Sequence, residues 1–115
     1  MKFSSTKLAG LILCEPRVYG DERGYLVETF RQDKLEEFLG YKIDFVQDNE
    51  SKSSFGVLRG LHYQLPPHSQ TKLVRVIEGS VLDIAVDIRK NSPTFGKHVA
   101  IELTGANKKQ LLVPR

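Results

Sequence analysis

Ionisable side chains stand among strand-like apolar residues in two neighbouring stretches, Val57–Gln64 and Lys72–Val76. The first stretch contains Arg59 and His62, and the second begins with Lys72. An ionisable group in a half-buried strand must find partners or shift its pKa, and such groups cluster at functional sites. These two stretches are therefore the first candidates for chemistry.

His62 and Lys72 have the side chains that proton abstraction beside a ketone requires. Histidine is the usual general base near neutral pH. Lys72 shares a strand face with Val74 and Val76, where an ammonium could stabilise an enolate oxygen. From spacing alone, two other interpretations stay open. His62 could donate a hydrogen bond to a backbone carbonyl, and Lys72 could extend to solvent from the start of a strand.

Arg59 raises a question of geometry. Strict alternation along a strand places Arg59 with Leu61 on one face and His62 on the other. Both side chains reach one site only if the strand is irregular, and Gly60 is where a bulge would be tolerated.

Other kinds of site have weaker patterns. His62, His68 and Glu78 could in principle hold a metal, but Gln64 stands where a His-x-His pair would need its second histidine. We therefore expect no metal. The chain also contains no nucleotide-binding glycine loop and no serine-nucleophile motif.

Two aspartates fall on a strand whose other face is rich in apolar residues. Asp83 and Asp87 alternate with Leu82, Ile84 and Ile88, which resemble the core face. We expect both carboxylates to be solvated or to play a supporting role.

Composition points to one globular domain, residues 1–115, with 40% hydrophobic and 27% charged residues. The net charge of +3 comes from scattered basic residues, which argues against nucleic acid and suits a small anionic ligand. A single cysteine, Cys14, is expected to pack as a small hydrophobe. With no apolar stretch of signal or membrane length, we expect no membrane partner and a cytoplasmic location.

The coarse pattern is one short helix among many short strands. Asp33–Leu39 is predicted to be helical, with Asp33 as N-cap, Glu36 completing a capping box and Gly40 as the stop. Strands are predicted at Leu8–Leu13 (ended by Pro16), Tyr25–Phe30, Ile43–Gln47, Val57–Gln64, Lys72–Ile77, Val81–Ile88, Val99–Leu103 and Gln110–Val113.

Turn residues separate these strands. Asp21–Gly24, Asn91–Pro93 and Thr104–Asn107 are typical turn sequences, and Glu78–Ser80 is predicted to join two strands as a tight hairpin. Short strands at this spacing favour a sandwich, barrel or jelly roll.

Five segments, in order and spacing, resemble those of the dTDP-4-dehydrorhamnose 3,5-epimerases: Asp21–Gly24, Phe45–Asn49, Gly56–Gln64, Lys72–Val76 and Ser92–Gly96. The resemblance extends from Leu8 onward. It implies a mainly β, cupin-type jelly roll, usually a homodimer, that works without a metal or organic cofactor. The implied substrate is a dTDP-4-keto-6-deoxy sugar, inverted at C3 and C5 through an enolate.

The resemblance also implies roles for single residues. His62 would be the base, Lys72 would stabilise the enolate oxygen, and Arg59 would bind the diphosphate or nearby polar groups. Further positions match those that hold the nucleotide or sugar: Arg23, Glu28, Gln47, Asn49 and the aromatic Tyr19.

The family pattern continues past the strand that ends near Arg115, with a tyrosine acid and an aspartate that orients the histidine. We therefore expect the chain to be the N-terminal portion of an epimerase domain, with an exposed sheet edge. Thr71 also departs from the family, which often has glycine there. Two alternatives remain: an epimerase acting at C3 or C5 only, and a catalytically silent module that binds a nucleotide sugar.

Overall fold

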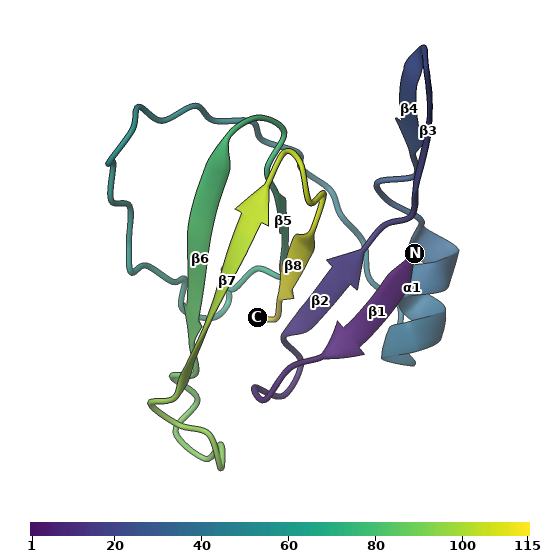
Figure 1. Ribbon diagram of the computed structural model, residues 1–115. Coiled ribbons are helices and arrows are strands. Elements are labelled where there is room, and N and C mark those ends of the chain that lie inside the picture. The colour runs from purple at the N-terminus through teal and green to yellow at the C-terminus, as the bar shows by residue number, and fades with distance from the viewer.

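A four-stranded antiparallel sheet forms the middle of the molecule, and the computed structural model describes all residues from 1 to 115 (Figure 1). Its strand order is β1-β2-β8-β5. These strands are β1 at Lys2–Ser5, β2 at Ile12–Glu15, β5 at Lys72–Arg75 and β8 at Gln110–Val113. Because β8 lies between β2 and β5, both of its edges are paired, and it is the most deeply buried strand.

Each face of this sheet carries its own hydrophobic cluster. Successive strand residues point to opposite faces, so Leu112 and Leu111 enter different clusters. Helix α1, at Gln32–Leu39, covers the Leu112 face through Leu35. A two-stranded ribbon of β6 (Ser80–Val86) and β7 (His98–Thr104) covers the Leu111 face through Leu103. The layers are therefore helix, sheet and ribbon (Figure 1).

Cys14 lies in the cluster on the helix side of the sheet and is 1% exposed. Burial raises the pKa of its thiol to about 11, because the thiolate would lose its hydration. The prediction that Cys14 packs as a small hydrophobe is confirmed.

A second two-stranded element, the β3–β4 hairpin, projects away from the three layers (Figure 1). Its strands are β3 at Val18–Asp21 and β4 at Gly24–Val27, and they pair only with each other. The predicted turn at Asp21–Gly24 is confirmed. Gly24 has φ +133°, a conformation that favours glycine.

The helix begins one residue earlier than predicted, and its predicted capping box is wrong. Arg31 is the N-cap and makes no side-chain capping bond, while Asp33 lies in the first turn and accepts hydrogen bonds from Arg31 at 2.9 and 2.8 Å. Glu36 accepts instead from the backbone N–H of Ile43 at 3.1 Å, which ties the chain after the helix to the helix itself. Gly40 ends the helix as expected, with φ 76°.

The strands predicted at 43–47 and 57–64 are wrong. Residues 42–71 contain no regular element, and although Ile43 is buried, most apolar side chains after it lie in solvent, with Val46 93% and Leu58 91% exposed. A strand needs a partner for its backbone groups, and apolar alternation does not reveal whether one exists. The prediction from pattern therefore failed where no second strand lies alongside.

The later strands lie at their predicted positions in the sequence, but their predicted pairing is not always correct. Strands β5, β6, β7 and β8 fall within or around their predicted ranges, whereas β1 was not predicted and β2 lies later than Leu8–Leu13. The expected hairpin at Glu78–Ser80 is wrong, because β5 pairs with β8 and β6 pairs with β7. The turn instead carries the chain from the sheet to the ribbon. Gly105 packs against it, since a Cβ at Gly105 would lie 2.5 Å from the Ile77 carbonyl oxygen.

The prediction that Leu82, Ile84 and Ile88 form the core face is wrong, and Asp87 is buried in a supporting role rather than solvated. The side chain of Asp87 is 1% exposed and accepts hydrogen bonds from Arg89 at 2.9 and 2.8 Å and from Ser92 and Thr94 at 2.6 Å each. These donors hold the pKa of its carboxyl far below its usual range. Apolar Leu82, by contrast, is 62% exposed. The face of β6 that packs on the sheet is therefore the face with the aspartates.

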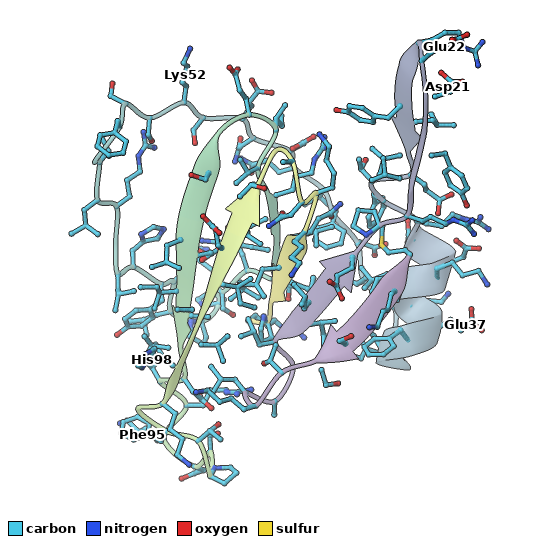
Figure 2. All side chains as sticks on the ribbon, viewed as in Figure 1. Asp21, Glu22, Glu37, Lys52, Phe95 and His98 are labelled. Carbon is cyan, nitrogen blue, oxygen red and sulfur yellow. The ribbon has the colours of Figure 1, made fainter.

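The predicted turn at 91–93 belongs to this segment. The carboxylate of Asp87 binds side chains along the stretch from 87 to 97. The backbone N–H of Gly96 also donates to the Asp87 carbonyl oxygen at 2.7 Å, which closes the loop. The resulting loop projects from the end of the ribbon, with Phe95 labelled near its tip (Figure 2).

Helix α1 has eight residues, and the molecule contains no helix long and apolar enough to cross a membrane.

Candidate functional site

Lys72 stands at the start of β5, on the sheet face that meets the β6–β7 ribbon. Its cross-strand partner is Val113, and both Val113 and Val74 pack against the hydrophobic cluster around Leu111. The side chain of Lys72 is half-buried. The sequence interpretation that placed an ammonium on an apolar strand face is therefore correct for β5.

His62 lies in the irregular segment that leads into β5, ten positions before Lys72, and it is exposed. Its ring folds back over Gly60, where a Cβ would come within 3.5 Å of Nδ1. Gly60 has φ +111°, a conformation that favours glycine. Because this segment is not part of a sheet, alternation of faces does not apply, and Arg59 and His62 need no bulge to serve one site.

Polar side chains along the same segment make local contacts. Arg59 Nη2 donates to the carbonyl oxygen of Lys52 at 3.2 Å, which closes a loop between them. Gln47 Nε2 donates to Asn49 Oδ1 at 3.1 Å, so these two predicted binding residues lie side by side. The side chains of Arg59, Gln47 and Asn49 are exposed and retain donors or acceptors for a ligand.

The remaining predicted residues belong to the β3–β4 hairpin and the turn after it. Arg23 donates to Asp21 through Nε and Nη2, with the shortest distance 2.6 Å. These bonds lower the pKa of Asp21. They leave Nη1 of Arg23 free to donate to an anion such as a phosphate oxygen.

Tyr19 and Glu28 complete this second group. The guanidinium of Arg17 lies 4.8 Å from the centroid of the Tyr19 ring, and the ring is 55% exposed. Glu28 pairs with Arg31 at 3.7 Å. An open depression of about 430 Å³ runs along the hairpin and is lined by Tyr19, Gly20, Asp21, Arg23, Gly24, Tyr25 and Leu26.

The structure thus divides the predicted site into two groups of residues. The loop group contains Gln47, Asn49, Arg59, His62 and Lys72; the hairpin group contains Tyr19, Arg23 and Glu28. The long segment before β5 starts beside α1, where Phe45 packs on Phe30 with ring centroids 5.5 Å apart, and then runs across to the side of the molecule away from the hairpin tip (Figure 1). Figure 2 shows this separation at labelled residues, with Asp21 and Glu22 at the hairpin tip and Lys52 on the outer side of the long segment. Within one copy of the chain, no hydrogen bond or ion pair joins a residue of one group to a residue of the other.

The residues of the loop group offer a base, an ammonium and amide donors. No three or more His, Cys, Asp or Glu side chains lie close enough together to hold a metal ion. The arrangement is suited to moving a proton and stabilising a nearby anion.

The family model described as dTDP-4-dehydrorhamnose 3,5-epimerase matches residues 5–115. The chain belongs to this epimerase family. A dTDP-4-dehydrorhamnose 3,5-epimerase of Shigella flexneri is 55% identical over 99% of the chain, and the chain spans 63% of that protein. All the residues of both groups lie within the matched range.

Solved structures of epimerases give the same result. The crystal structure of dTDP-4-dehydrorhamnose 3,5-epimerase from Elizabethkingia anophelis is 53% identical with a TM-score of 0.93, and the match covers 100% of this chain and 63% of that one. The 3,5-epimerase of Legionella pneumophila, in complex with dTDP-4-keto-L-rhamnose, is 50% identical with a TM-score of 0.93 over 99% of this chain and 60% of that one. The expected mainly β, cupin-type jelly-roll class is confirmed.

Sequence reasoning missed how the chain fixes its loop at 87–97. A detectable signal was present, because Asp87, Arg89, Ser92 and Thr94 place one acceptor and three donors within eight positions. Such spacing lets side chains satisfy one another locally. The turn in this segment was predicted from Pro93, but the hydrogen bonds that Asp87 accepts there were not.

Proposed function

We propose that this protein inverts C3 and C5 of dTDP-4-dehydro-6-deoxyglucose to give dTDP-4-dehydrorhamnose, without a metal or organic cofactor. The observation that carries the proposal is the position of half-buried Lys72 on the face of β5 that Val74 and its partner Val113 make apolar, in a chain that belongs to the 3,5-epimerase family. Residues 1–115 would form a single domain that contributes the base and the enolate-stabilising group.

The chemistry begins at the 4-keto group, which acidifies the C–H bonds at C3 and C5. His62 takes one of these protons, and the electrons of the broken C–H bond form an enolate whose negative charge lies on the C4 oxygen. Lys72 stabilises that oxygen, and its apolar surroundings strengthen the attraction. A proton delivered to the opposite face of the same carbon restores the ketone with inverted configuration. The second carbon then follows the same steps.

Binding would use both groups of residues. Arg59 would contact the diphosphate, and Gln47 with Asn49 would hold the sugar through amide hydrogen bonds. Tyr19, Arg23 and Glu28 would hold the nucleotide end by stacking, by charge and by hydrogen bonding.

The separation of the two groups supports a homodimer. The strands of the hairpin pair only with each other, the hairpin projects from the layers, and its Tyr19 and Arg23 are exposed. Such a hairpin is suited to reach a second copy of the chain. In a two-fold dimer, the hairpin of one chain would complete the site of the other, and each chain would do the same for its partner. We also propose a cytoplasmic location, which suits the buried free thiol of Cys14.

Conversion of the dTDP-linked 4-keto sugar, followed by proton NMR with and without a chelator, tests the proposed activity. We expect the dehydrorhamnose product in both samples. Inversion at one carbon only would identify a single-site epimerase, and binding without conversion would identify a silent module. Loss of activity on chelation that returns with added metal would contradict the cofactor-independent mechanism.

A further inference from the structure

We propose that Lys108 is a positioning residue, which fixes the orientation of the β3–β4 hairpin and thereby sets affinity for the nucleotide end of the substrate. The inference rests on the proposed function, because it takes Tyr19, Arg23 and Glu28 as the residues that hold the nucleotide. Lys108 itself would not touch the substrate.

The contact that carries this inference joins the β7–β8 turn to the hairpin. Lys108 Nζ donates to the hydroxyl of Tyr25 at 2.7 Å, and the same ammonium lies 4.5 Å from the centroid of the Tyr25 ring. The two residues are 83 positions apart in the chain. Because the ammonium engages both the ring and its hydroxyl, it restrains the direction of the Tyr25 side chain as well as its distance.

The backbone at Lys108 is in an uncommon conformation. Its φ of 54° makes it the one non-glycine residue of the chain with positive φ. Such a conformation costs free energy and persists where the surrounding structure fixes it, often at functional sites. The positive φ of Lys108 therefore supports a role for its side chain.

Asn107 provides the rigid base for that conformation. Its Oδ1 accepts from the backbone N–H groups of Thr104 at 3.0 Å and Lys109 at 2.9 Å, and its Nδ2 donates to the carbonyl of Glu102 at 3.0 Å. The turn is therefore tied to the end of β7 and to the residue before β8, so Lys108 extends from a turn that is fixed on both sides.

A second, independent contact anchors the base of the hairpin. Gln110 is 1% exposed, and its Nε2 donates to the carbonyl oxygen of Thr29 at 2.7 Å. Tyr25 and Thr29 bracket Glu28 along the chain, and Arg23 lies two positions before Tyr25. The two anchors thus restrain the backbone that carries two of the three residues proposed to hold the nucleotide.

Within one copy of the chain, little else restrains the hairpin. Its strands pair only with each other, and seven of the eight residues in β3 and β4 are exposed. Tilting of the hairpin would move Arg23 and Glu28 together relative to any ligand held elsewhere. Loss of the Lys108 contact should consequently weaken nucleotide binding while leaving proton transfer to a bound substrate unchanged.

The test compares Lys108→Met with two matched variants in the intact protein. Lys108→Arg keeps a cation that can donate to Tyr25 and lie over its ring. Lys109→Met removes the neighbouring lysine, which instead pairs with Glu15 at 3.7 Å. Two quantities are measured: hydrogen exchange of the hairpin amides at 18–27, and the dissociation constant for dTDP.

We expect Lys108→Met to speed exchange in the hairpin and to weaken dTDP binding by about three- to tenfold. Its rate of turnover at saturating substrate should be unchanged. Lys108→Arg and Lys109→Met should resemble the unmodified protein in both measurements.

Unchanged hairpin exchange in Lys108→Met would overturn the inference, whatever the dTDP result. Faster exchange with unchanged dTDP affinity would also overturn it, because the anchor would then have no bearing on binding. Failure of the unmodified protein to bind dTDP would instead overturn the proposed function, and the nucleotide part of this inference with it; the exchange measurement would still decide whether Lys108 anchors the hairpin.

Discussion

At the scale of single residues, Lys72 and His62, which are proposed to do the chemistry, differ in how firmly the fold holds them. Lys72 stands in a paired strand, opposite Val113, with Val74 beyond it on the same face. His62 stands in an irregular, exposed segment. Electrostatic stabilisation is most effective when the charged group is fixed before the reaction, which the fold achieves for Lys72.

Replacement of His62 by alanine should remove the base. We expect turnover to fall by about 10²–10⁴-fold, while affinity for dTDP changes by no more than a few-fold. Steady-state kinetics and dTDP titration measure the two effects. His68→Ala is the matched control, because His68 is also an exposed histidine of the same segment. Retained turnover in His62→Ala would remove His62 from the role of base.

Replacement of Lys72 by methionine keeps the apolar stem and removes the charge. Because the charge on the C4 oxygen develops only in the enolate, kcat should fall by about 10²–10³-fold and KM should change little. The exposed Lys90 gives a control variant, Lys90→Met. Equal kcat in Lys72→Met and in the unmodified protein would reassign Lys72 to packing.

At the scale of elements, two aspartates close together in the chain have pKa values shifted in opposite directions. Asp87 holds the loop at 87–97, and Asp83 lies in β6 of the ribbon. Hydrogen bonds from Arg89, Ser92 and Thr94 lower the pKa of Asp87. Burial without such donors raises the pKa of Asp83. The charged form is therefore favoured by folding at Asp87 and disfavoured at Asp83.

Asp87→Asn should lower the melting temperature at pH 7, whereas Asp83→Asn should leave it unchanged or raise it. The folded-state pKa of Asp87 is depressed, so its stabilisation is complete above its unfolded value near 3.8 and is lost as pH falls below that value. The folded-state pKa of Asp83 is raised, so its charged form opposes folding at neutral pH. Thermal unfolding of both variants between pH 3 and pH 7 measures these effects.

The difference between Asp87→Asn and the unmodified protein should shrink toward pH 3. A difference that is constant with pH, or a larger loss in Asp83→Asn than in Asp87→Asn, would contradict this account of the loop.

Some elements could be predicted from the sequence because the information is local. Strand β8 was predicted with its observed limits, and the helix within one residue, since apolar spacing and Gly40 mark them. The irregular segment from 42 to 71 could not be predicted, because a strand depends on a partner that its own residues do not specify. The contact between Lys108 and Tyr25 could not be predicted either, because the two residues are far apart in the sequence and Lys108 has a left-handed backbone conformation that is uncommon for a lysine.

For the candidate site, the sequence predicted residue types and the face of Lys72, but not the separation of the site into two groups. Motif matching places Arg23 and His62 in one site without specifying which copy of the chain supplies each. The projecting hairpin, whose strands pair only with each other, is the observation that favours a second copy as the source of Arg23.

At the scale of the whole molecule, the proposed dimer makes a prediction about mixed variants. His62→Ala impairs the loop group, and Arg23→Ala impairs the hairpin group. If each site takes its hairpin from the partner, a heterodimer of the two variants contains one intact site and one doubly impaired site. Random mixing of equal amounts should restore about one quarter of the unmodified activity.

Activity of the mixture, measured after subunit exchange, checks this prediction, with each variant alone as the control. Absence of any gain on mixing would contradict a site shared between chains. A monomer in sedimentation that is nevertheless fully active would exclude the dimer altogether.

The central claim is that His62 removes the protons at C3 and C5, which are then replaced from the opposite face of each carbon. Proton NMR of dTDP-4-dehydro-6-deoxyglucose in D₂O tests it most directly, comparing the intact protein with its His62→Ala variant. We expect deuterium at both carbons with the unmodified protein and at neither with the variant. Absence of deuterium at both carbons with unmodified protein that binds dTDP, or equal incorporation by the variant, would contradict the claim.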